Sequence, residues 1–325
     1  MLLAGDIGGT KTLLGLFATG NVRPAAIESR SYRTLDFPDL SALCLRFLAE
    51  TSTDASAIDA ASFGVAGPIT GTRAQLTNVP WIVDVDALRT RLPVVRAYLL
   101  NDLEALAWSV AVLTPDEIEV LHEGRANPNG SVALIAAGTG LGIALLPRVD
   151  GHLVPHASEG GHVDFAPRNV EEQSLAAALI QEYGRADVER VVSGPGLANI
   201  QRILYPHECA ALTPMPRAND LPAAISRSAM ETTCPLCRRA LELFVSAYGA
   251  SAGNLALTVL ATGGVYLGGG IAPRILPALR WAPFMESFLN KSPMDALVSN
   301  IPVRVILNPA AGLLGAATYA NSRRS

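Results

Sequence analysis

The residues best suited to phosphate chemistry lie at the beginning of the chain, where two adjacent glycines separate two apolar runs. We expect residues 2–17 to form a strand, a tight turn at Gly8 and Gly9, and a second strand. Paired glycines permit a sharp turn whose backbone N–H groups stay uncovered, and such groups form a concave nest for phosphate oxygens. Thr10 would add a hydroxyl donor to this nest and Lys11 a positive charge.

Asp6 is the unusual residue of this stretch, because it places a negative charge beside the predicted phosphate nest. A carboxylate and a phosphate repel each other unless a cation lies between them. Asp6 therefore indicates Mg²⁺, bound directly or through water. The alternative is an ordinary hairpin with an aspartate at its mouth, because short Gly-Gly turns are common.

A second stretch repeats this design 130 residues later. An apolar run over residues 131–137 is followed by Gly138, Thr139 and Gly140 and then by another apolar run over residues 141–146. Two such hairpins predict a duplicated fold with one phosphate loop in each half.

A third glycine cluster follows a short apolar run near the end of the chain. Gly268, Gly269 and Gly270 come after a predicted strand and before a predicted helix that has Pro273 in its first turn. Three glycines expose bare backbone, against which the flat face of an adenosine could lie. The alternative is a tight turn between a strand and a helix.

Asn101 and Asp102 stand at the end of a predicted strand over residues 94–100. Ligands of open α/β sheets collect at the carboxyl ends of the strands. An aspartate there can accept a proton from a hydroxyl group and direct its oxygen at a phosphorus atom. The alternative is that Asp102 caps the helix predicted over residues 104–113, because N-caps favour aspartate.

Glu159 and His162 flank two glycines in a polar loop. A carboxylate and an imidazole together offer acceptors and a donor to a ligand with many hydroxyl groups. They could instead form a metal pair, but the other histidines show no recognisable ligand spacing.

The four cysteines, Cys44, Cys209, Cys234 and Cys237, suggest no disulfide framework and fit a reducing cytosol. Cys234 and Cys237 have the spacing of half a zinc site or of a redox pair. No second pair completes a site of four cysteines, so we interpret them as ordinary, partly buried side chains.

The composition argues against several classes of protein. The chain has 325 residues, enough for about two domains, and half of them are hydrophobic. The net charge of −4 argues against a nucleic-acid or membrane-surface partner. No run approaches the roughly 18 apolar residues of a spanning helix, and no basic leader precedes the first strand. We therefore predict a cytoplasmic protein.

The order of the predicted elements indicates an α/β fold in two parts. Three strands open the chain, and helices and strands then alternate. A second α/β part begins after a turn at residues 127–130. Its longest helix is predicted over residues 236–260, where apolar side chains recur on one stripe, and a final strand is predicted at 303–307.

The motifs together resemble those of one family, the bacterial glucokinases of the hexokinase and actin-like ATPase superfamily, essentially from end to end. The motifs are G-D-I-G-G-T-K-T at residues 5–12, L-N-D-L-E-A at 100–105, A-G-T-G-L-G at 137–142, S-E-G-G-H-V-D-F-A-P at 158–167, E-R-V-V-S-G-P-G-L at 189–197, G-G-V-Y-L-G-G-G-I at 263–271 and N-P-A-A-G-L-L-G at 308–315. The first and sixth occur across the superfamily, whereas the fourth and fifth are far more specific.

The resemblance implies a role for each candidate residue. Asp102 would be the general base for the 6-hydroxyl of the sugar. The residues that would hold the other sugar hydroxyls are Asn101, Glu159, His162 and Glu189. The loops at residues 8–11 and 138–140 would hold the phosphates of ATP, residues 268–270 would face its adenosine, and Asp6 would serve Mg²⁺.

The resemblance also implies two actin-like, ribonuclease H-like α/β domains around a cleft. The smaller domain would comprise residues 1–112 and 303–325, and the larger would comprise residues 113–302. Family analogy further predicts a homodimer. The related repressor–kinase–open-reading-frame sugar kinases carry a cysteine-rich zinc motif shortly after E-x-G-H, and nothing like it follows His162, so we predict no zinc.

The predicted reaction is the ATP-dependent phosphorylation of glucose to glucose 6-phosphate, the first step of glycolysis. A sister kinase for fructose, mannose or an N-acetylhexosamine would differ only in its sugar pocket. A non-catalytic actin-like or sugar-sensing protein is the alternative of another class. An actin-like filament or chaperone would not need Glu159 and His162, and a sugar-responsive repressor would need a DNA-binding domain before the first strand.

Overall fold

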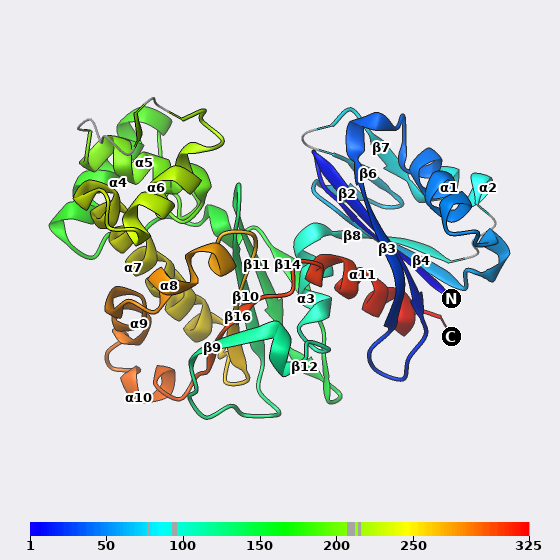
Figure 1. Ribbon diagram of the computed structural model, residues 1–325. Helices are drawn as coiled ribbons and strands as arrows, with labels where there is room; N and C mark the ends of the chain where they lie inside the picture. The colour runs from blue at the N-terminus through cyan, green and yellow to red at the C-terminus, as the bar shows by residue number, and fades with distance from the viewer. Residues whose placement is uncertain (77–78, 93–95, 207–211, 214–215, 325) are drawn as a thin grey trace. The chain divides into compact units, whose positions relative to one another are not determined.

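A computed structural model describes residues 1–76, 79–92, 96–206, 212–213 and 216–324 of the chain. The chain forms two compact units (Figure 1). Unit 1 comprises Met1–Pro115 together with Asn308–Ser325, and unit 2 comprises Asp116–Leu307. The sequence analysis placed residues 303–307 with the N-terminal domain, whereas strand β16 (Val303–Ile306) pairs with strands of unit 2. The chain therefore returns to unit 1 only at Asn308.

The sheet of unit 1 has five strands in the order β3-β2-β1-β4-β8. Their bounds are Leu2–Ile7 for β1, Lys11–Ala18 for β2, Ala25–Arg33 for β3, Ala60–Val65 for β4 and Ala97–Asn101 for β8. Strands β1 and β2 form the expected antiparallel hairpin, in which Leu2 is opposite Phe17 and Ile7 is opposite Thr12. Strand β4 runs parallel to β1, and β8 runs parallel to β4. The carboxyl ends of β1, β4 and β8 therefore lie at one edge of the sheet.

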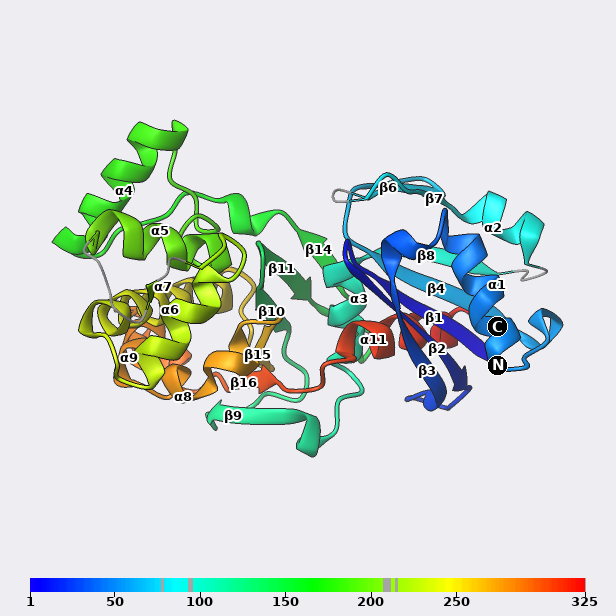
Figure 2. The ribbon, with the colours of Figure 1, turned by 45° about the horizontal axis from the view of Figure 1, so that its top comes forward.

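Helices cover both faces of this sheet (Figures 1 and 2). One face is covered by α1 (Leu40–Glu50) and α2 (Val85–Arg91), and the other by α3 (Asp102–Ser109) and α11 (Ala311–Ser322). Because side chains alternate along a strand, Leu3 and Ile7 of β1 join the core with α1 and α2, while Leu2 and Ala4 join the core with α3 and α11. Strand β4, which lies between β1 and β8, is consequently buried along its whole length.

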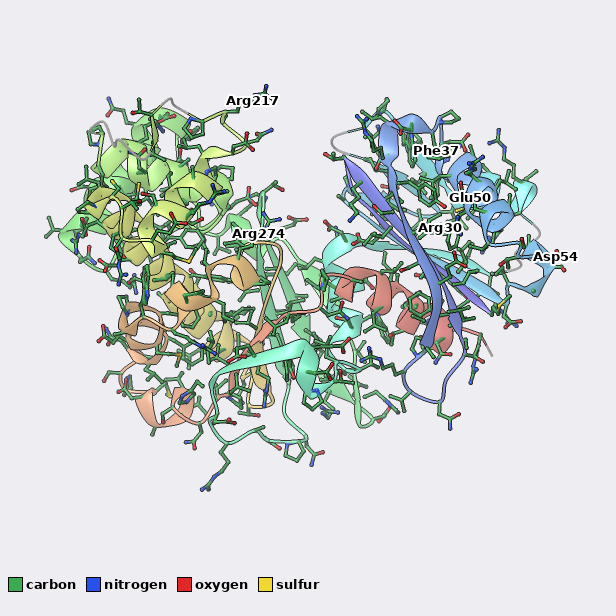
Figure 3. All side chains as sticks on the ribbon, in the orientation of Figure 1. Arg30, Phe37, Glu50, Asp54, Arg217 and Arg274 are labelled. Carbon is green, nitrogen blue, oxygen red and sulfur yellow. The ribbon has the colours of Figure 1, made fainter. Side chains whose placement is uncertain are left out.

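Polar contacts fix helix α1 at both ends. Asp39 is its N-cap and accepts a hydrogen bond from the backbone N–H of Ala42 at 2.8 Å. At the other end, the carboxylate of Glu50 lies 2.9 Å from the guanidinium of Arg30 on β3, and the two residues are neighbours in Figure 3. Tyr32 donates its hydroxyl to the same carboxylate at 2.8 Å. The end of the helix is therefore tied to the edge strand of the sheet.

A small three-stranded antiparallel sheet lies between β4 and β8 in the sequence. Its strands are β5 (Ile69–Thr70), β6 (Arg73–Gln75) and β7 (Ile82–Asp84). Asp84 caps helix α2 by accepting hydrogen bonds from the backbone N–H groups of Asp86 and Ala87.

The sheet of unit 2 repeats the arrangement of unit 1, with strands in the order β14-β11-β10-β15-β16-β9. Their bounds are Ile118–His122 for β9, Val132–Ala137 for β10, Leu141–Leu146 for β11, His156–Ser158 for β14, Gly264–Gly268 for β15 and Val303–Ile306 for β16. An antiparallel hairpin again carries a third antiparallel strand on one side and two parallel strands on the other. Strand β9 is an addition at the far edge. A separate two-stranded ribbon consists of β12 (Arg148–Val149) and β13 (His152–Leu153).

The helices of unit 2 gather around the long helix α7 (Figures 1 and 2). Their bounds are Val170–Tyr183 for α4, Gly194–Leu204 for α5, Leu221–Met230 for α6, Pro235–Thr258 for α7, Leu276–Leu279 for α8, Ala282–Leu289 for α9 and Asp295–Val298 for α10. Tyr248 of α7 is buried and donates its hydroxyl to the carbonyl oxygen of Ile135 in β10 at 3.1 Å. A Cβ at Gly249 would lie 2.0 Å from the carbonyl oxygen of Phe284, so α9 approaches α7 where only a glycine fits. The core of unit 2 thus lies between α7 and the sheet.

Cys234 and Cys237 are both buried at the start of α7, more deeply than the sequence predicted. Cys209 and the first two residues of the strand predicted at 94–100 lie outside the described residues. Within the ranges that the structure describes, no helix has both the length and the apolar character needed to cross a membrane.

Candidate active site

The loop between β1 and β2 is held by its own backbone and by one outside residue. The N–H of Gly8 donates to the carbonyl oxygen of Lys11 at 3.1 Å. From outside, Thr34 donates its hydroxyl to the carbonyl oxygen of Gly8 at 2.8 Å and its N–H to that of Thr10 at 3.2 Å. Thr34 is buried, and its hydroxyl oxygen also lies 3.0 Å from that of Thr12. Sequence reasoning missed this support because Thr34 lies 26 residues from Gly8.

The loop presents its remaining candidate residues outward. Gly9 is partly buried, and the side chains of Thr10 and Lys11 are exposed. A Cβ at Gly8 would lie 2.8 Å from the carbonyl oxygen of Lys11, so this form of the turn requires a glycine. The arrangement agrees with a backbone cradle that adds one hydroxyl and one ammonium group.

Asp6 lies near the end of β1 and is partly buried. Burial, together with a smaller contribution from the charge of Asp102, raises the pKa of Asp6 to about 6, while the charge of Lys11 acts in the opposite direction. A Cβ at Gly312 would lie 3.0 Å from the Asp6 carboxylate, so the first turn of α11 packs directly on it. A partly buried carboxylate near a second carboxylate fits a hard cation such as Mg²⁺.

The donor set around Asp6 limits how such a cation would be held. Among the residues that the structure describes, no three His, Cys, Asp or Glu side chains form a group suited to a metal ion. Mg²⁺ commonly uses one or two protein carboxylates and completes its shell with water and substrate phosphates. Asp6 fits that mode of binding.

Asn101 and Asp102 follow the carboxyl end of β8, and here the structure corrects one alternative. The N-cap of helix α3 is Asn101, not Asp102, because Oδ1 of Asn101 accepts the backbone N–H of Leu103 at 3.0 Å. Asp102 is the first residue of the helix and is exposed. Its Oδ1 also lies 2.9 Å from the N–H of Leu103. The helix cap therefore does not depend on Asp102 alone.

Two glycines set the position of Asp102 above the sheet. A Cβ at Gly64 in β4 would lie 2.7 Å from the Cβ of Ala105 and 3.7 Å from the Cα of Asp102. A Cβ at Gly315 in α11 would lie 1.6 Å from the carbonyl oxygen of Ala105. Helix α3 can reach this position only because both neighbours lack a side chain there. The result is that Asp102 comes close enough to Asp6 for its charge to raise the pKa of Asp6.

In unit 2, the turn after β15 is bonded to the end of β10. The N–H of Ile271 donates to the carbonyl oxygen of Ala137 at 3.1 Å. Gly269 has a φ of +79°, and a Cβ there would lie 2.3 Å from the same oxygen, so only a glycine fits. Gly270, in contrast, is exposed and has open space where a Cβ would lie. The helix that the sequence predicts here begins as a 3-10 helix at Ala272–Ile275 and continues directly into α8.

The loop between β10 and β11 lies beside this turn. The N–H of Gly138 donates to the carbonyl oxygen of Gly140 at 2.8 Å, which closes the loop. The N–H of Gly194, at the start of α5, donates to the carbonyl oxygen of Gly138 at 2.8 Å. The side chain of Thr139 is exposed, and Gly268 is buried at the end of β15. The second and third glycine clusters therefore form one continuous surface of backbone in unit 2.

Glu159, His162 and Glu189 come together near the start of β11. A Cβ at Gly161 would lie 2.0 Å from the carbonyl oxygen of Leu141, so the loop needs a glycine to pack on the strand. The N–H of Glu189 donates to the carbonyl oxygen of Gly161 at 2.9 Å, and the carboxylate of Glu189 accepts the N–H of Leu141 at 2.8 Å. The ring of His162 lies 3.9 Å from the carboxylate of Glu159 and 4.0 Å from that of Glu189. The side chain of Glu159 is 94% exposed, so it is open to a ligand.

A further carboxylate, which the sequence analysis missed, faces the same histidine. Asp187 is buried, and its Oδ2 lies 3.9 Å from Nδ1 of His162. Its Oδ1 accepts the backbone N–H of Arg190 at 2.9 Å. An aspartate that bonds to the backbone three residues later is a turn signal, and this was the one local feature that could have drawn attention to it.

The candidate residues thus form two groups, one in each unit. Unit 1 holds two carboxylates, an amide and the glycine loop with its lysine, at residues 6, 8–11, 101 and 102. Unit 2 holds two glycine turns and a cluster of acids around an imidazole, at residues 138–140, 159, 162, 187, 189 and 268–270. The first group can bind a cation and accept a proton, and the second can bind a flat ring, an anion and hydroxyl groups.

Comparisons of the sequence with a family model and with known proteins indicate the same family. The sequence model of the Glucokinase family matches residues 3–323. A glucokinase of Nostoc punctiforme is 40% identical over 338 residues, which cover 98% of this chain and 98% of the relative.

Solved structures show the same likeness. A glucokinase from an Antarctic psychrotroph is 28% identical, with a TM-score of 0.86 and coverage of 99% of this chain and 98% of that one. A ROK family glucokinase from Streptomyces griseus, solved with glucose and AMPPNP, is 19% identical and shares the fold, with a TM-score of 0.66 and coverage of 99% of each chain. These likenesses confirm the predicted actin-like α/β fold with its duplicated sheet.

Proposed function

Because this chain belongs to the glucokinase family and phosphorylates glucose, we propose that Asp102 is the general base of the reaction. Asp102 accepts the proton of the glucose 6-hydroxyl as that oxygen attacks the γ-phosphorus of ATP. A new bond forms between the sugar oxygen and phosphorus, and the bond from phosphorus to the β-phosphate oxygen breaks. The products are glucose 6-phosphate, ADP and the proton on Asp102, and the reaction serves as the first step of glycolysis.

The observation that carries this proposal is that Asn101, and not Asp102, is the N-cap of helix α3. Asn101 caps helix α3, so the fold does not depend on the Asp102 carboxylate alone. Asp102 is exposed in the first helical turn, at the carboxyl edge of the parallel strands where ligands of α/β sheets bind. A base needs this combination of exposure and fixed backbone.

Each group of residues by itself offers hydrogen bonds that suit a sugar. Glu159 and Glu189 offer carboxylate oxygens to its hydroxyls, and His162 offers a ring nitrogen. Asn101, whose Oδ1 is used by the helix cap, offers its amide N–H groups. The set suits a neutral ligand with several hydroxyls, because it can both donate and accept.

The nucleotide is assigned to the glycine turns. The Streptomyces griseus glucokinase of the same fold was solved with an ATP analogue, and by that likeness we assign ATP to this chain. In each unit, the loop at residues 8–11 or at 138–140 suits phosphate oxygens. In unit 2, the exposed backbone at Gly270 suits the adenosine. Mg²⁺ bound through Asp6, directly or through water, would neutralise phosphate charge.

A coupled assay with ATP across a panel of hexoses tests the substrate. We expect the highest kcat/KM with glucose, and lower values with fructose, mannose and N-acetylhexosamines. A higher value with another hexose would assign the chain to a sister kinase. ATP turnover that no sugar stimulates would contradict the proposal. The predicted homodimer and cytoplasmic location stay predictions, which light scattering and cell fractionation would test.

A further inference from the structure

We propose that Asp187 is a positioning residue for the sugar-binding site. It fixes the ring of His162 so that Nδ1 carries the proton and faces Asp187, while Nε2 faces the sugar and accepts a hydrogen bond from one of its hydroxyls. The inference rests on the proposed function, because it assumes that His162 binds the sugar. It adds a residue from outside the motifs that define the candidate site.

The carboxylate of Asp187 is buried and is held by contacts with Arg190. Its side chain is only 8% exposed. Oδ1 accepts the backbone N–H of Arg190 at 2.9 Å, and Oδ2 lies 3.5 Å from Nε of the same arginine. Asp187 forms a β-bridge with Asp164, and the next residue, Val188, donates its N–H to the carbonyl oxygen of Val163 at 3.0 Å. The segment that carries Asp187 is therefore fixed to the segment that carries His162.

Nε of Arg190 donates no hydrogen bond to Oδ2 of Asp187. The Nε of Arg190 is buried and has no hydrogen-bond partner among the described residues, which means that its 3.5 Å contact with Asp187 is a charge interaction only. The guanidinium group lies 4.0 Å from the ring centre of Tyr183, which holds it by a cation–π contact. An ionised carboxylate only accepts hydrogen bonds, so Oδ2 calls for an N–H. Nδ1 of His162 is the ring nitrogen that faces it, at 3.9 Å.

Glu189 also faces Nδ1 of His162, at 4.0 Å, but it is less suited to hold the ring. Its side chain is 32% exposed, and one oxygen already accepts the N–H of Leu141. It is thus open to a ligand hydroxyl, whereas Asp187 is closed to ligands. A contact of 3.9 Å becomes a hydrogen bond after a small rotation of the ring, and such bonds commonly tighten when the substrate binds.

The chemical consequence concerns which ring nitrogen meets the sugar. The hydrogen bond at one nitrogen of a neutral histidine fixes the proton there and makes the other nitrogen an acceptor. Nε2 lies 3.9 Å from the carboxylate of Glu159, which is exposed and open to the same ligand. With Nδ1–H directed at Asp187, Nε2 accepts from a sugar hydroxyl. The tautomer of the ring is then already set when the ligand arrives.

Steady-state kinetics of Asp187→Asn test this role. The variant keeps an oxygen for the N–H of Arg190 but replaces the acceptor that faces His162 with an amide. We expect KM for glucose to rise about three- to tenfold, the usual worth of one hydrogen bond, with KM for ATP unchanged. Asp164→Asn is the matched control, because Asp164 shares the same β-bridge but is 85% exposed and pairs with Arg185. An unchanged KM for glucose in Asp187→Asn would overturn the inference.

The double variant Asp187→Asn, His162→Ala separates positioning from a general effect on the fold. If Asp187 acts through His162, adding Asp187→Asn to His162→Ala should leave KM for glucose unchanged. An equal rise in both backgrounds would overturn the inference, because Asp187 would then act through Arg190 or through the fold.

Nitrogen-15 NMR of the wild-type protein gives a result that needs no variant of Asp187. The five histidines are resolved by their ring nitrogens, and His162 is identified by comparison with His162→Ala. With the ring neutral, we expect the proton on Nδ1, and a proton on Nε2 would overturn the inference. Wild-type protein without glucose-dependent turnover would refute the proposed function, and the tautomer in the same sample would still decide the role of Asp187.

Discussion

The two units share one sheet topology but carry different chemistry on it. Each contains an antiparallel hairpin whose glycine turn is closed by a backbone hydrogen bond, from Gly8 to Lys11 in unit 1 and from Gly138 to Gly140 in unit 2. Beyond the turns they diverge. Unit 1 places its acids on strand β1 and at the start of helix α3, whereas unit 2 places its acids on segments that fold back onto the sheet.

This difference suggests a division of tasks. In unit 1, Asp6 and Asp102 sit within β1 and at the start of α3, so rigid elements fix their positions. In unit 2, Glu159 and His162 depend on a loop that packs through Gly161. Rigid placement suits the chemical step, because small errors in geometry there cost rate. We therefore expect substitutions in unit 1 to affect turnover and those in unit 2 to affect binding.

The largest expected effect is that of Asp102→Asn. Because Asp102 is the proposed general base, loss of its carboxylate should lower kcat by about 10²–10⁴-fold. The melting temperature should not change, because Asn101 still caps α3. Asn101→Ala is the matched variant and should cost about 0.5–2 kcal/mol of stability through loss of the cap. Turnover and melting curves of both variants provide the check. An equal loss of stability in Asp102→Asn would contradict the division between the two residues.

The next effect concerns the pH dependence of unit 1. Because the pKa of Asp6 is raised from 3.8 to about 6, folding favours its protonated form. That stabilisation is fully present below pH 3.8 and is lost as the pH rises through about 6. The free energy of unfolding of Asp6→Asn should therefore equal that of the wild type in acid and exceed it by up to about 3 kcal/mol above pH 7.

Denaturant unfolding between pH 3.5 and 8 measures this effect. Asp54→Asn is the control of opposite sign, because the hydrogen bond from Ser56 lowers the pKa of Asp54. Its replacement should reduce stability near neutral pH and have little effect in acid. A constant difference between Asp6→Asn and the wild type across this range would show that burial does not raise the pKa of Asp6.

In unit 2, substitutions should act on the sugar. We expect Glu159→Gln or His162→Ala to raise KM for glucose by the equivalent of about 1–3 kcal/mol while changing KM for ATP far less. Each change removes a hydrogen bond to an uncharged ligand or leaves its partner unpaired. Initial rates measured over a range of glucose and ATP concentrations test this prediction. A parallel rise in KM for glucose and KM for ATP would instead indicate a role in folding or nucleotide binding.

The smallest effects should separate two neighbouring glycines. Gly269→Ala would force a left-handed backbone and a 2.3 Å contact, so it should cost about 1–3 kcal/mol of stability. Gly270→Ala meets nothing within 4 Å, so its melting temperature should stay the same. If adenosine lies on this backbone, the added methyl should raise KM for ATP by about tenfold. An unchanged KM for ATP in Gly270→Ala would show that the adenosine does not bind at this backbone.

Much of this architecture could be predicted because its signals are local. The glycine turns between apolar runs at residues 2–17 and 131–146 predict both hairpins, and their repetition predicts the duplicated sheet. The cap of α3 could not be predicted, because asparagine and aspartate are equally good caps and stand side by side at residues 101 and 102. Only the backbone geometry assigns the cap to Asn101.

The contacts that the sequence did not reveal are long-range. Thr34 supports a loop 26 residues away, and Asp187 faces His162 from a segment to which the sequence analysis assigned no element. Strand β16 belongs to unit 2 because it pairs with β15 and β9, which a strand pattern at residues 303–307 does not disclose. Pairing between distant segments depends on the fold as a whole.

The central claim is that Asp102 serves the chemical step rather than folding or binding. The measurement that tests it most directly is the glucose affinity of Asp102→Asn by calorimetry, on the same preparation whose turnover is measured. The account predicts an affinity close to that of the wild type beside a kcat at least about 100-fold lower. Near-wild-type turnover with normal glucose affinity would contradict it.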